Sequence, residues 1–277
     1  MVEYHILNLG VGVQSTTLFL MIREGIVKFP NYGVAVFADT QEEPQAVYRH
    51  LEWLKSLTPP RIYVRTAAKL GNDVVKGRNT TGGRFAAIPA FTTDGVSQGM
   101  TRRQCTKEYK TEVIQRTIRR EVIGLAKGRA IGNDTEVHQY IGISRDEARR
   151  SINVKKNIES RRGWFAHFPL LEMGWTRQDC LRWLADRVPH QVPRSACVFC
   201  PFHSDAEWLR IKRDDPTGWA RAIEIDIALR TSGSVANRDM RQTMYLHRSH
   251  LPLEYVDLNE KQIGLGFNAE CEGMCGV

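Results

Sequence analysis

The chain has 277 residues, enough to bury a full hydrophobic core as one large or two modest domains. It has no apolar run of about 18 residues and no secretory signal pattern, so we expect a cytoplasmic protein without a membrane partner. The net charge of +8 indicates a polyanionic or multiply charged partner. The six cysteines indicate metal or redox chemistry rather than a disulfide framework.

Residues 6–40 follow the order strand, glycine loop, helix and strand. Apolar residues 6–9 predict a strand, residues 10–17 (Gly-Val-Gly-Val-Gln-Ser-Thr-Thr) open a helix over 18–24, and residues 34–38 predict a strand that ends in Asp39 and Thr40. Glycines let the backbone approach a phosphate, and a helix N-terminus offers unpaired N–H groups. Ligands of open α/β sheets bind at this edge. The segment therefore predicts a site for a nucleotide or another phosphorylated molecule.

This glycine loop differs from two common nucleotide-binding motifs. A P-loop requires Gly-Lys-Ser/Thr, and no lysine follows these glycines. The dinucleotide fingerprint requires a third small residue where Ser15 stands, so the match is partial. A plain strand-to-helix connection is the alternative interpretation.

The remaining chain alternates between helical and strand patterns. We expect helices over residues 43–57, 106–120 and 217–230, and two more after the capping boxes at Thr176 and Ser204. We expect strands over 61–64 and 138–143 and an irregular segment over 66–100. Such alternation predicts an α/β fold with a doubly wound parallel sheet. We expect one α/β domain over residues 1–235 and a cysteine-bearing C-terminal extension over 236–277.

The positive charge is concentrated in residues 102–162. This stretch holds 16 Lys and Arg against 8 Asp and Glu, an excess of +8 that accounts for the whole net charge. A local positive field attracts polyanions or a charged small molecule, so the stretch is a candidate nucleic-acid interface. Interleaved glutamates leave a solvated helix face as the alternative.

Five of the six cysteines form short motifs or precede a basic helix. Cys197 and Cys200 form a Cys-x2-Cys knuckle, Cys271 and Cys275 lie in the tail, and Cys105 precedes the predicted helix 106–120. Two short-spaced pairs can bind zinc, and iron–sulfur clusters also take four thiolates, so spacing alone leaves both open. A structural zinc knuckle is the simplest alternative. Cys180, in the first turn of a predicted helix, is expected to be a core residue.

Over residues 4–203 the sequence resembles the phosphoadenylyl-sulfate reductase-like family of the adenine nucleotide alpha hydrolase (PP-loop) superfamily. The segments that carry the resemblance are Gly10-Val11-Gly12-Val13-Gln14-Ser15, Asp39-Thr40 with Glu43-Pro44, Cys105 to Lys110, Ile143 to Arg150, and Phe168-Pro169-Leu170 with Trp175-Thr176. The resemblance implies an adenine nucleotide at the glycine loop, with ATP or a related nucleotide, and magnesium, as ligands. The implied nucleotide-binding residues are Gly10, Val11, Gly12, Gln14, Ser15, Thr16, Asp39 and Thr40.

The resemblance also implies a [4Fe–4S] cluster, with zinc or metal-free redox thiols as alternatives. Cys105, Cys197 and Cys200 would be three ligands. One tail cysteine would be the fourth; we assign Cys275 to it and Cys271 to sulfur chemistry, although the two roles can be exchanged. Three features depart from the family pattern. Gly10 stands where the loop has its first serine, Gln14 replaces the aspartate of the loop, and no histidine follows Glu270-Cys271-Glu272-Gly273.

The function that the resemblance implies is that of an ATP pyrophosphatase in sulfur transfer to nucleic acid, such as DNA phosphorothioation or tRNA thiolation. Asp39, Arg145 and Cys271 are the expected catalytic residues, and a cysteine desulfurase is an expected sulfur donor. One alternative is a sulfonucleotide reductase that uses a tail cysteine. Another is a nucleotide-dependent nucleic-acid-binding protein without catalytic activity, an alternative that Gln14 in place of the acid leaves open.

Overall fold

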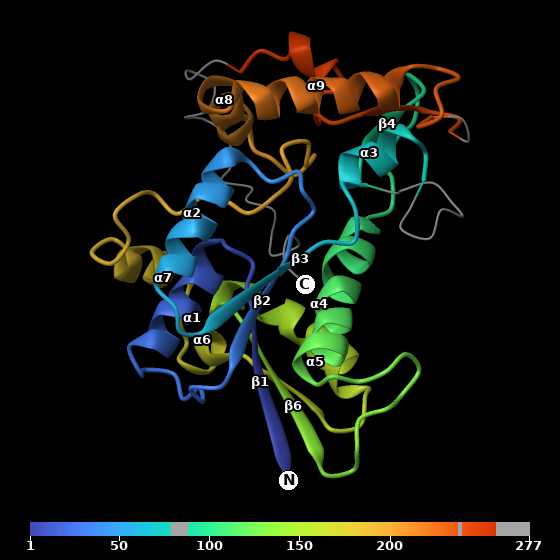
Figure 1. Cartoon of the computed structure of the whole chain (residues 1–277). Helices are drawn as coiled ribbons and strands as arrows, with labels where there is room; N and C mark the ends of the chain where they lie inside the picture. The colour runs from blue at the N-terminus through green and yellow to red at the C-terminus, as the bar shows by residue number, and fades with distance from the viewer. Residues whose placement is uncertain (79–87, 238–239, 259–277) are drawn as a thin grey trace.

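The computed structural model describes residues 1–78, 88–237 and 240–258, and its centre is a parallel β-sheet (Figure 1). Five strands lie in the order β3-β2-β1-β6-β7, and every neighbouring pair is parallel. They are β1 (Val2–Asn8), β2 (Val34–Ala38), β3 (Arg61–Arg65), β6 (Thr135–Ile141) and β7 (Trp164–His167). The order reverses between β1 and β6, which makes the carboxyl ends of these two strands the switch point of the sheet.

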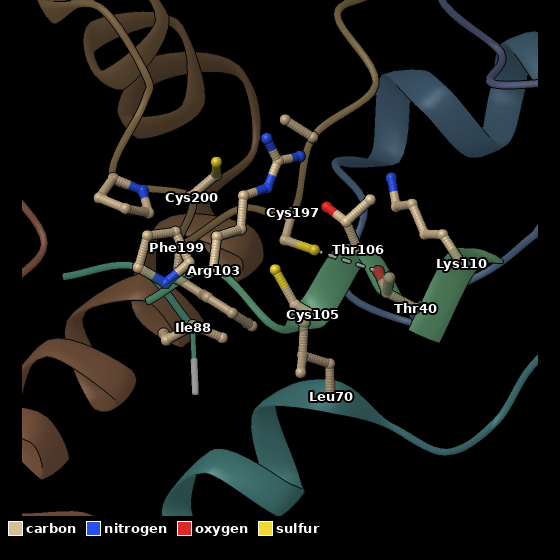
Figure 2. Close-up of a pocket in the computed structure, with 13 residues that line it drawn as sticks. Thr40, Leu70, Ile88, Arg103, Cys105, Thr106, Lys110, Cys197, Phe199 and Cys200 are labelled. Carbon is tan, nitrogen blue, oxygen red and sulfur yellow. Dashed lines mark hydrogen bonds between the residues drawn. The ribbon is translucent and has the colours of Figure 1, made fainter. Parts of the chain in front are cut away.

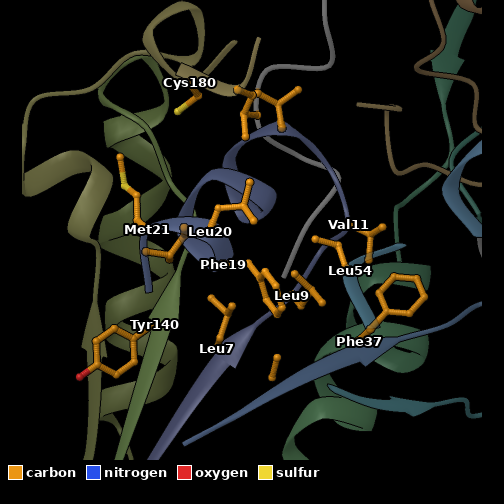
Figure 3. Close-up of a cluster of buried hydrophobic side chains, with 14 of the residues drawn as sticks. Leu7, Leu9, Val11, Phe19, Leu20, Met21, Phe37, Leu54, Tyr140 and Cys180 are labelled. Atoms are coloured by element: carbon orange, nitrogen blue, oxygen red, sulfur yellow. The ribbon is translucent and has the colours of Figure 1, made fainter. Parts of the chain in front are cut away.

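Helices cover both faces of this sheet, which confirms the predicted α/β architecture. Successive strand residues point to opposite faces. Leu7 of β1 accordingly packs in a cluster with α1, α2 and α7 (Figure 3), whereas Ile6 packs in a second cluster with α4 and α5. The helices are α1 (Val13–Arg23), α2 (Gln45–Ser56), α3 (Leu70–Val75), α4 (Glu112–Thr117), α5 (Ala148–Glu159), α6 (Pro169–Glu172), α7 (Arg177–Leu184), α8 (Asp205–Asp214) and α9 (Pro216–Arg230).

Two helices begin where the capping patterns predict. The hydroxyl of Thr176 accepts a hydrogen bond from the Asp179 N–H across 3.2 Å, and the Asp179 carboxylate accepts one from the Thr176 N–H across 2.8 Å. The hydroxyl of Ser204 accepts from the Glu207 N–H across 3.3 Å. These side chains satisfy N–H groups that have no partner within the helix, so α7 and α8 start at the following residues.

The predicted helix over residues 106–120 extends further and is not uniformly α-helical. The π-helical turns η1 (Thr106–Thr111) and η2 (Ile118–Val122) flank α4 directly. Single π-helical turns often occur at functional sites, since they change the direction in which side chains project. Here η1 begins next to Cys105 and carries Lys110, which lie on one side of the pocket described below.

A second, antiparallel sheet lies outside the central one. It joins β4 (Phe91–Thr93), β5 (Gln98–Met100) and β8 (Thr243–Tyr245) in the order β5-β4-β8. The expectation that residues 66–100 are irregular is therefore wrong for α3 and for these two short strands. Three-residue strands are too short to show a period-2 pattern, and β5 is exposed along its length, so the sequence carries little signal for them.

Part of the predicted C-terminal extension packs against α9. Asp226 of α9 is fully buried, and its carboxylate accepts hydrogen bonds from the N–H groups of Leu246 and Leu253, both across 3.0 Å. Both leucines belong to the same hydrophobic cluster as α8 and α9, together with the 3₁₀ turn η4 (Leu253–Tyr255). The domain boundary at residue 235 stays a prediction, and Cys271 and Cys275 lie outside the described residues.

Candidate functional site

The glycine loop connects β1 to α1 at the switch point of the sheet, and its backbone is strained. Val11 has φ of 59°, a left-handed conformation that a β-branched residue rarely adopts, and its side chain is fully buried (Figure 3). Strain of this kind tends to persist where function requires it. Gly12 is the N-cap of α1, and its N–H donates to the Ser15 hydroxyl across 3.1 Å. The α1 N-terminus begins at Val13, earlier than the sequence predicts.

The segment that leaves β6 lies directly against the glycine loop. A β-carbon at Gly142 would lie 2.9 Å from both the carbonyl carbon of Gln14 and the nitrogen of Ser15. Only glycine therefore permits this approach of the two backbones. The loops that follow β1 and β6 thus form one continuous edge, where α/β proteins bind their ligands.

Gln14 contacts a carboxylate that the sequence analysis did not single out. Its amide nitrogen lies 3.3 Å from Glu147 Oε2 and 3.4 Å from the hydroxyl of buried Ser144. Burial raises the pKa of Glu147. Arg145, the predicted phosphate ligand, is exposed in the 3₁₀ turn η3 (Arg145–Glu147), one residue after Ser144. Glu147 lies in the segment 143–150, which carries part of the family resemblance. An acidic residue in that segment was the only sequence signal that could have identified it.

Asp39 and Thr40 follow β2 and point to different partners. The Asp39 carboxylate accepts hydrogen bonds from the Gln41 N–H across 2.7 Å and the Tyr48 hydroxyl across 3.0 Å, which orient it at the end of the strand. The Thr40 hydroxyl lies 3.2 Å from Cys197 Sγ and so links this edge to the cysteine knuckle. Thr16, a predicted nucleotide ligand, is buried and bonds to His50 Nε2 across 2.8 Å, so it faces α2.

Three predicted metal ligands line one pocket (Figure 2). Cys105 precedes η1, and Cys197 and Cys200 lie in the turn after residue 195; Figure 2 shows the Cys105 and Cys197 sulfur atoms directed toward one another. The pocket has a volume of about 440 Å³ including its open mouth. Its lining residues are Thr40, Leu70, Ile88, Pro89, Arg103, Cys105, Thr106, Lys110, Ala196, Cys197, Phe199, Cys200 and Pro201.

The donor set of this pocket fits a thiolate-bound metal group. Burial raises the pKa of the Cys197 thiol, which a bound metal would reverse by stabilising the thiolate, and Arg103 and Lys110 bring positive charge to the same lining. A tetrahedral zinc ion with Zn–S bonds of about 2.3 Å holds sulfur atoms about 3.8 Å apart. Within the described residues, the ligand atoms found within 4.8 Å of one another are those of another group, not these three cysteines. An iron–sulfur cluster and zinc therefore both stay predictions for this pocket.

A buried ion pair adjoins the pocket and was not assigned a role from the sequence. Lys110 Nζ lies 3.2 Å from Glu43 Oε1, and the side chain of Glu43 is fully buried. Glu43 Oε2 accepts a hydrogen bond from the Ser195 hydroxyl across 3.2 Å. Burial raises the pKa of Glu43, against the influence of Lys110. The pair therefore holds the segment before Cys197 in place, because breaking it would leave a buried charge without a partner.

The segment 193–200 joins the pocket to the glycine loop. A β-carbon at Gly12 would lie 3.8 Å from the Ser195 nitrogen and 4.0 Å from the Pro193 carbonyl oxygen, which are ordinary contact distances. Two residues after Ser195, Cys197 lines the pocket. The loop and the thiols are thus neighbours at one edge of the sheet.

By contrast, Cys180 is a buried core residue, as predicted, and burial raises its pKa to about 11.

Several arginines of the basic stretch 102–162 bind the protein itself. Arg119 and Arg120 donate to the carbonyl groups of Arg129 and Leu125, in the segment between η2 and β6. Arg161 donates to the Asn157 carbonyl at the end of α5. Basic side chains commonly satisfy the last carbonyls of helices in this way. Nucleic-acid contact stays a prediction, and Arg149, Lys155 and Lys156 are the exposed charges on α5 that suit it best.

No protein-family model, curated protein or solved structure matches this chain. Among the described residues, no helix is both long and apolar enough to cross a lipid bilayer.

Proposed function

We propose that the chain binds an adenine nucleotide at the glycine loop and uses it to activate an acceptor for sulfur transfer. The acceptor we favour is nucleic acid. The observation that carries the proposal is the short segment 193–200. It passes beside Gly12, where an added β-carbon would lie 3.8 Å from the Ser195 nitrogen, and it brings Cys197 and Cys200 to the pocket. A phosphate site and a thiol site that share one sheet edge suit a reaction in which a nucleotide and a sulfur atom meet.

Each residue has a role that follows from its place. The N–H groups at the start of α1 would bind phosphate oxygens, since they have no partners within the helix. Arg145 would contact a second phosphate, because guanidinium forms bidentate contacts with its oxygens. Asp39 would bind the ribose or a magnesium ion. Glu147 would add a carboxylate beside Gln14, where the resemblance leads us to expect an acid.

The proposed reaction has two displacement steps. An acceptor oxygen attacks the α-phosphorus of ATP, the bond between the α- and β-phosphates breaks, and pyrophosphate leaves. The outer sulfur of a persulfide, supplied by a donor protein, then displaces AMP, which departs with the acceptor oxygen. A further thiol breaks the S–S bond to the donor, so that a disulfide forms and the sulfur stays on the acceptor as a thiol. The protein contributes mainly positioning and charge stabilisation, so the absence of a lysine after the glycines is no obstacle.

A cluster bound by Cys105, Cys197 and Cys200 would supply sulfur-binding or redox capacity next to this reaction. Lys110 and Arg103 would balance the negative charge of the thiolates. The fourth ligand would come from Cys271 or Cys275, which leaves the other tail cysteine for sulfur transfer.

ATP labelled at the α- and γ-phosphates, incubated with the anaerobically purified chain, tests the proposal. We expect nucleic-acid-dependent release of pyrophosphate and AMP when transfer RNA or DNA and a persulfide donor are present. Binding of ATP without cleavage under any condition would favour the non-catalytic alternative. Release of sulfite from a sulfonucleotide would favour the reductase. Absence of any adenine-nucleotide binding would refute the proposal.

A further inference from the structure

A second cluster of ligand-type side chains lies on β1 and β6, toward their amino ends. Both strands carry the pattern Glu-x-His, as Glu3-Tyr4-His5 and Glu136-Val137-His138. The two strands lie side by side (Figure 1), and their parallel register pairs Glu3 with Glu136 and His5 with His138. Residues two apart on a strand share a face, so the four side chains project on the same side. His5 is five residues, or about 17 Å, from Gly10, so the cluster is separate from the glycine loop.

The distances within this cluster match a mixed nitrogen and oxygen ligand set. His5 Nε2 lies 3.2 Å from Glu3 Oε2, and His138 Nε2 lies 3.3 Å from Glu136 Oε2. The two imidazole rings stack with centroids 4.8 Å apart. The ligand atoms of Glu3, His5 and His138 all lie within 4.8 Å of one another. Tetrahedral zinc with bonds of about 2.0–2.2 Å separates such ligands by about 3.4 Å, so small side-chain movements suffice.

The other ring nitrogens are held by hydrogen bonds from outside the cluster. His5 Nδ1 lies 3.1 Å from the Tyr140 hydroxyl, and His138 Nδ1 lies 2.9 Å from His167 Nε2. Metal-binding histidines almost always use the second nitrogen in this way, which orients the ring and leaves the first nitrogen for the metal. Tyr140 and His167 are paired in register on β6 and β7, so the sheet itself fixes both supports.

One buried atom in the cluster lacks a satisfactory partner. His138 Nε2 is buried and makes no hydrogen bond of acceptable geometry, although Glu136 Oε2 is near. A buried polar atom in this state costs free energy unless something else occupies its lone pair. A metal ion bound between His138 and His5 would satisfy it.

We propose that this cluster is a binding site for a divalent transition-metal ion, of which zinc is the best match. His5 Nε2, His138 Nε2 and a Glu3 oxygen are the ligands, and Glu136 or water completes the set. The ion joins β1 to β6 at the end of the sheet opposite the glycine loop, so its role is to stabilise the sheet. The Glu3 side chain is 45% exposed, which gives the ion a route from solvent.

Cobalt(II) is the probe of choice, because its spectrum distinguishes this site from the metal site that we propose at the cysteine pocket. Cobalt bound by thiolates shows intense sulfur-to-metal absorption, whereas cobalt bound by histidine and carboxylate does not. We expect the chelator-treated full chain to bind one cobalt ion without thiolate absorption. His138→Gln should abolish this signal, and Tyr140→Phe should weaken binding about tenfold, as the loss of a supporting hydrogen bond does. Zinc should raise the midpoint of thermal unfolding by more in the parent than in His138→Gln, since zinc at the cysteine pocket would affect both equally.

The control is Glu52→Gln, an exposed carboxylate on α2, which should bind cobalt as the parent does. If His138→Gln does not fold, Glu3→Gln decides, because its half-exposed side chain tolerates replacement; we expect about tenfold weaker binding. Cobalt spectra that contain thiolate bands alone would overturn the proposal. The same non-thiolate signal in the parent and in the folded variants would overturn it too.

Discussion

The amide nitrogen of Gln14 lies 3.3 Å from the carboxylate of Glu147, across the edge where the loops after β1 and β6 meet. An amide cannot hold a metal ion by charge, but its partner can. The resemblance leads us to expect an acid where Gln14 stands. The structure has a carboxylate beside this position, and it comes from a residue 133 positions further along the chain. Whether the site cleaves ATP thus depends on Glu147 in the proposed function.

Glu147→Gln should weaken binding of magnesium-bound ATP about tenfold, or ~1.4 kcal/mol, and lower ATP cleavage. The change preserves shape and removes the charge. Titration calorimetry with ATP, with and without magnesium, measures this affinity in the variant and the parent. Glu112→Gln, an exposed glutamate on α4, is the matched control and should bind as the parent does. An equal affinity in Glu147→Gln and the parent would assign the metal to Asp39 or to no protein carboxylate.

Gly12→Val should weaken nucleotide binding while leaving the fold intact. Gly12 has φ of −109°, which any residue adopts, and a β-carbon there meets Ser195 only at 3.8 Å. The methyl groups of valine extend beyond this β-carbon and would narrow the space in which we propose that phosphate binds. Gly12→Ala should have the same melting temperature and a smaller loss of affinity. Calorimetry with ATP is the measurement, and unchanged affinity in the valine variant would move the phosphate site elsewhere.

The anaerobically purified protein should be brown, with about four irons per chain. Cys105→Ala, Cys197→Ala and Cys200→Ala should each remove the colour, because all three line one pocket. Cys180→Ala should keep it, since that thiol is buried in the core. Of Cys271 and Cys275, one substitution should remove the cluster and the other should impair sulfur transfer alone. Thiolate-bound zinc without iron, lost on mutating either tail cysteine, would indicate a structural site instead.

Nucleic-acid binding, if it uses the basic stretch, should depend on the exposed lysines of α5. Replacing both Lys155 and Lys156 with Ala should lower the slope of log affinity against log salt by about two units. The control replaces Lys28 and Lys76, which are exposed but lie outside the stretch. Arg119 and Arg120 are poor targets, because their guanidinium groups bond to backbone carbonyls. An unchanged slope in the α5 variant would place the interaction on another surface.

Acid should destabilise the protein partly through His50. Burial lowers the pKa of this imidazole to about 3, from a usual value of 6.5, so the unfolded chain binds a proton that the folded chain does not. Above pH 6.5 His50 is neutral in both states, so the folded state incurs no penalty for keeping it neutral. Between pH 6.5 and 3 only the unfolded chain gains a proton, so the free energy of unfolding falls as the pH falls. Urea midpoints across this range should fall less steeply for His50→Gln than for the parent. Parallel curves would show that His50 does not control the acid sensitivity.

Local patterns were sufficient for much of the fold. The strand before the glycine loop, the loop itself and the caps at Thr176 and Ser204 are short-range features, and each appears where the sequence predicts it. The burial of Cys180 was predicted from its place in the first turn of a helix, because a free cysteine there usually behaves as a small core residue. The strands of the small second sheet were missed, because three residues carry no periodicity.

The candidate sites depend on contacts that no local pattern contains. The sequence identifies Cys105 and Cys197 as thiols, but only folding brings residues 92 positions apart to one pocket. Likewise, Gln14 meets Glu147, and Glu3 meets His138, because the sheet places β6 beside β1 in a particular register. Side-chain chemistry and element type are encoded locally along the chain. Which reactive groups face one another is decided by strand order and register, which are properties of the packed sheet as a whole.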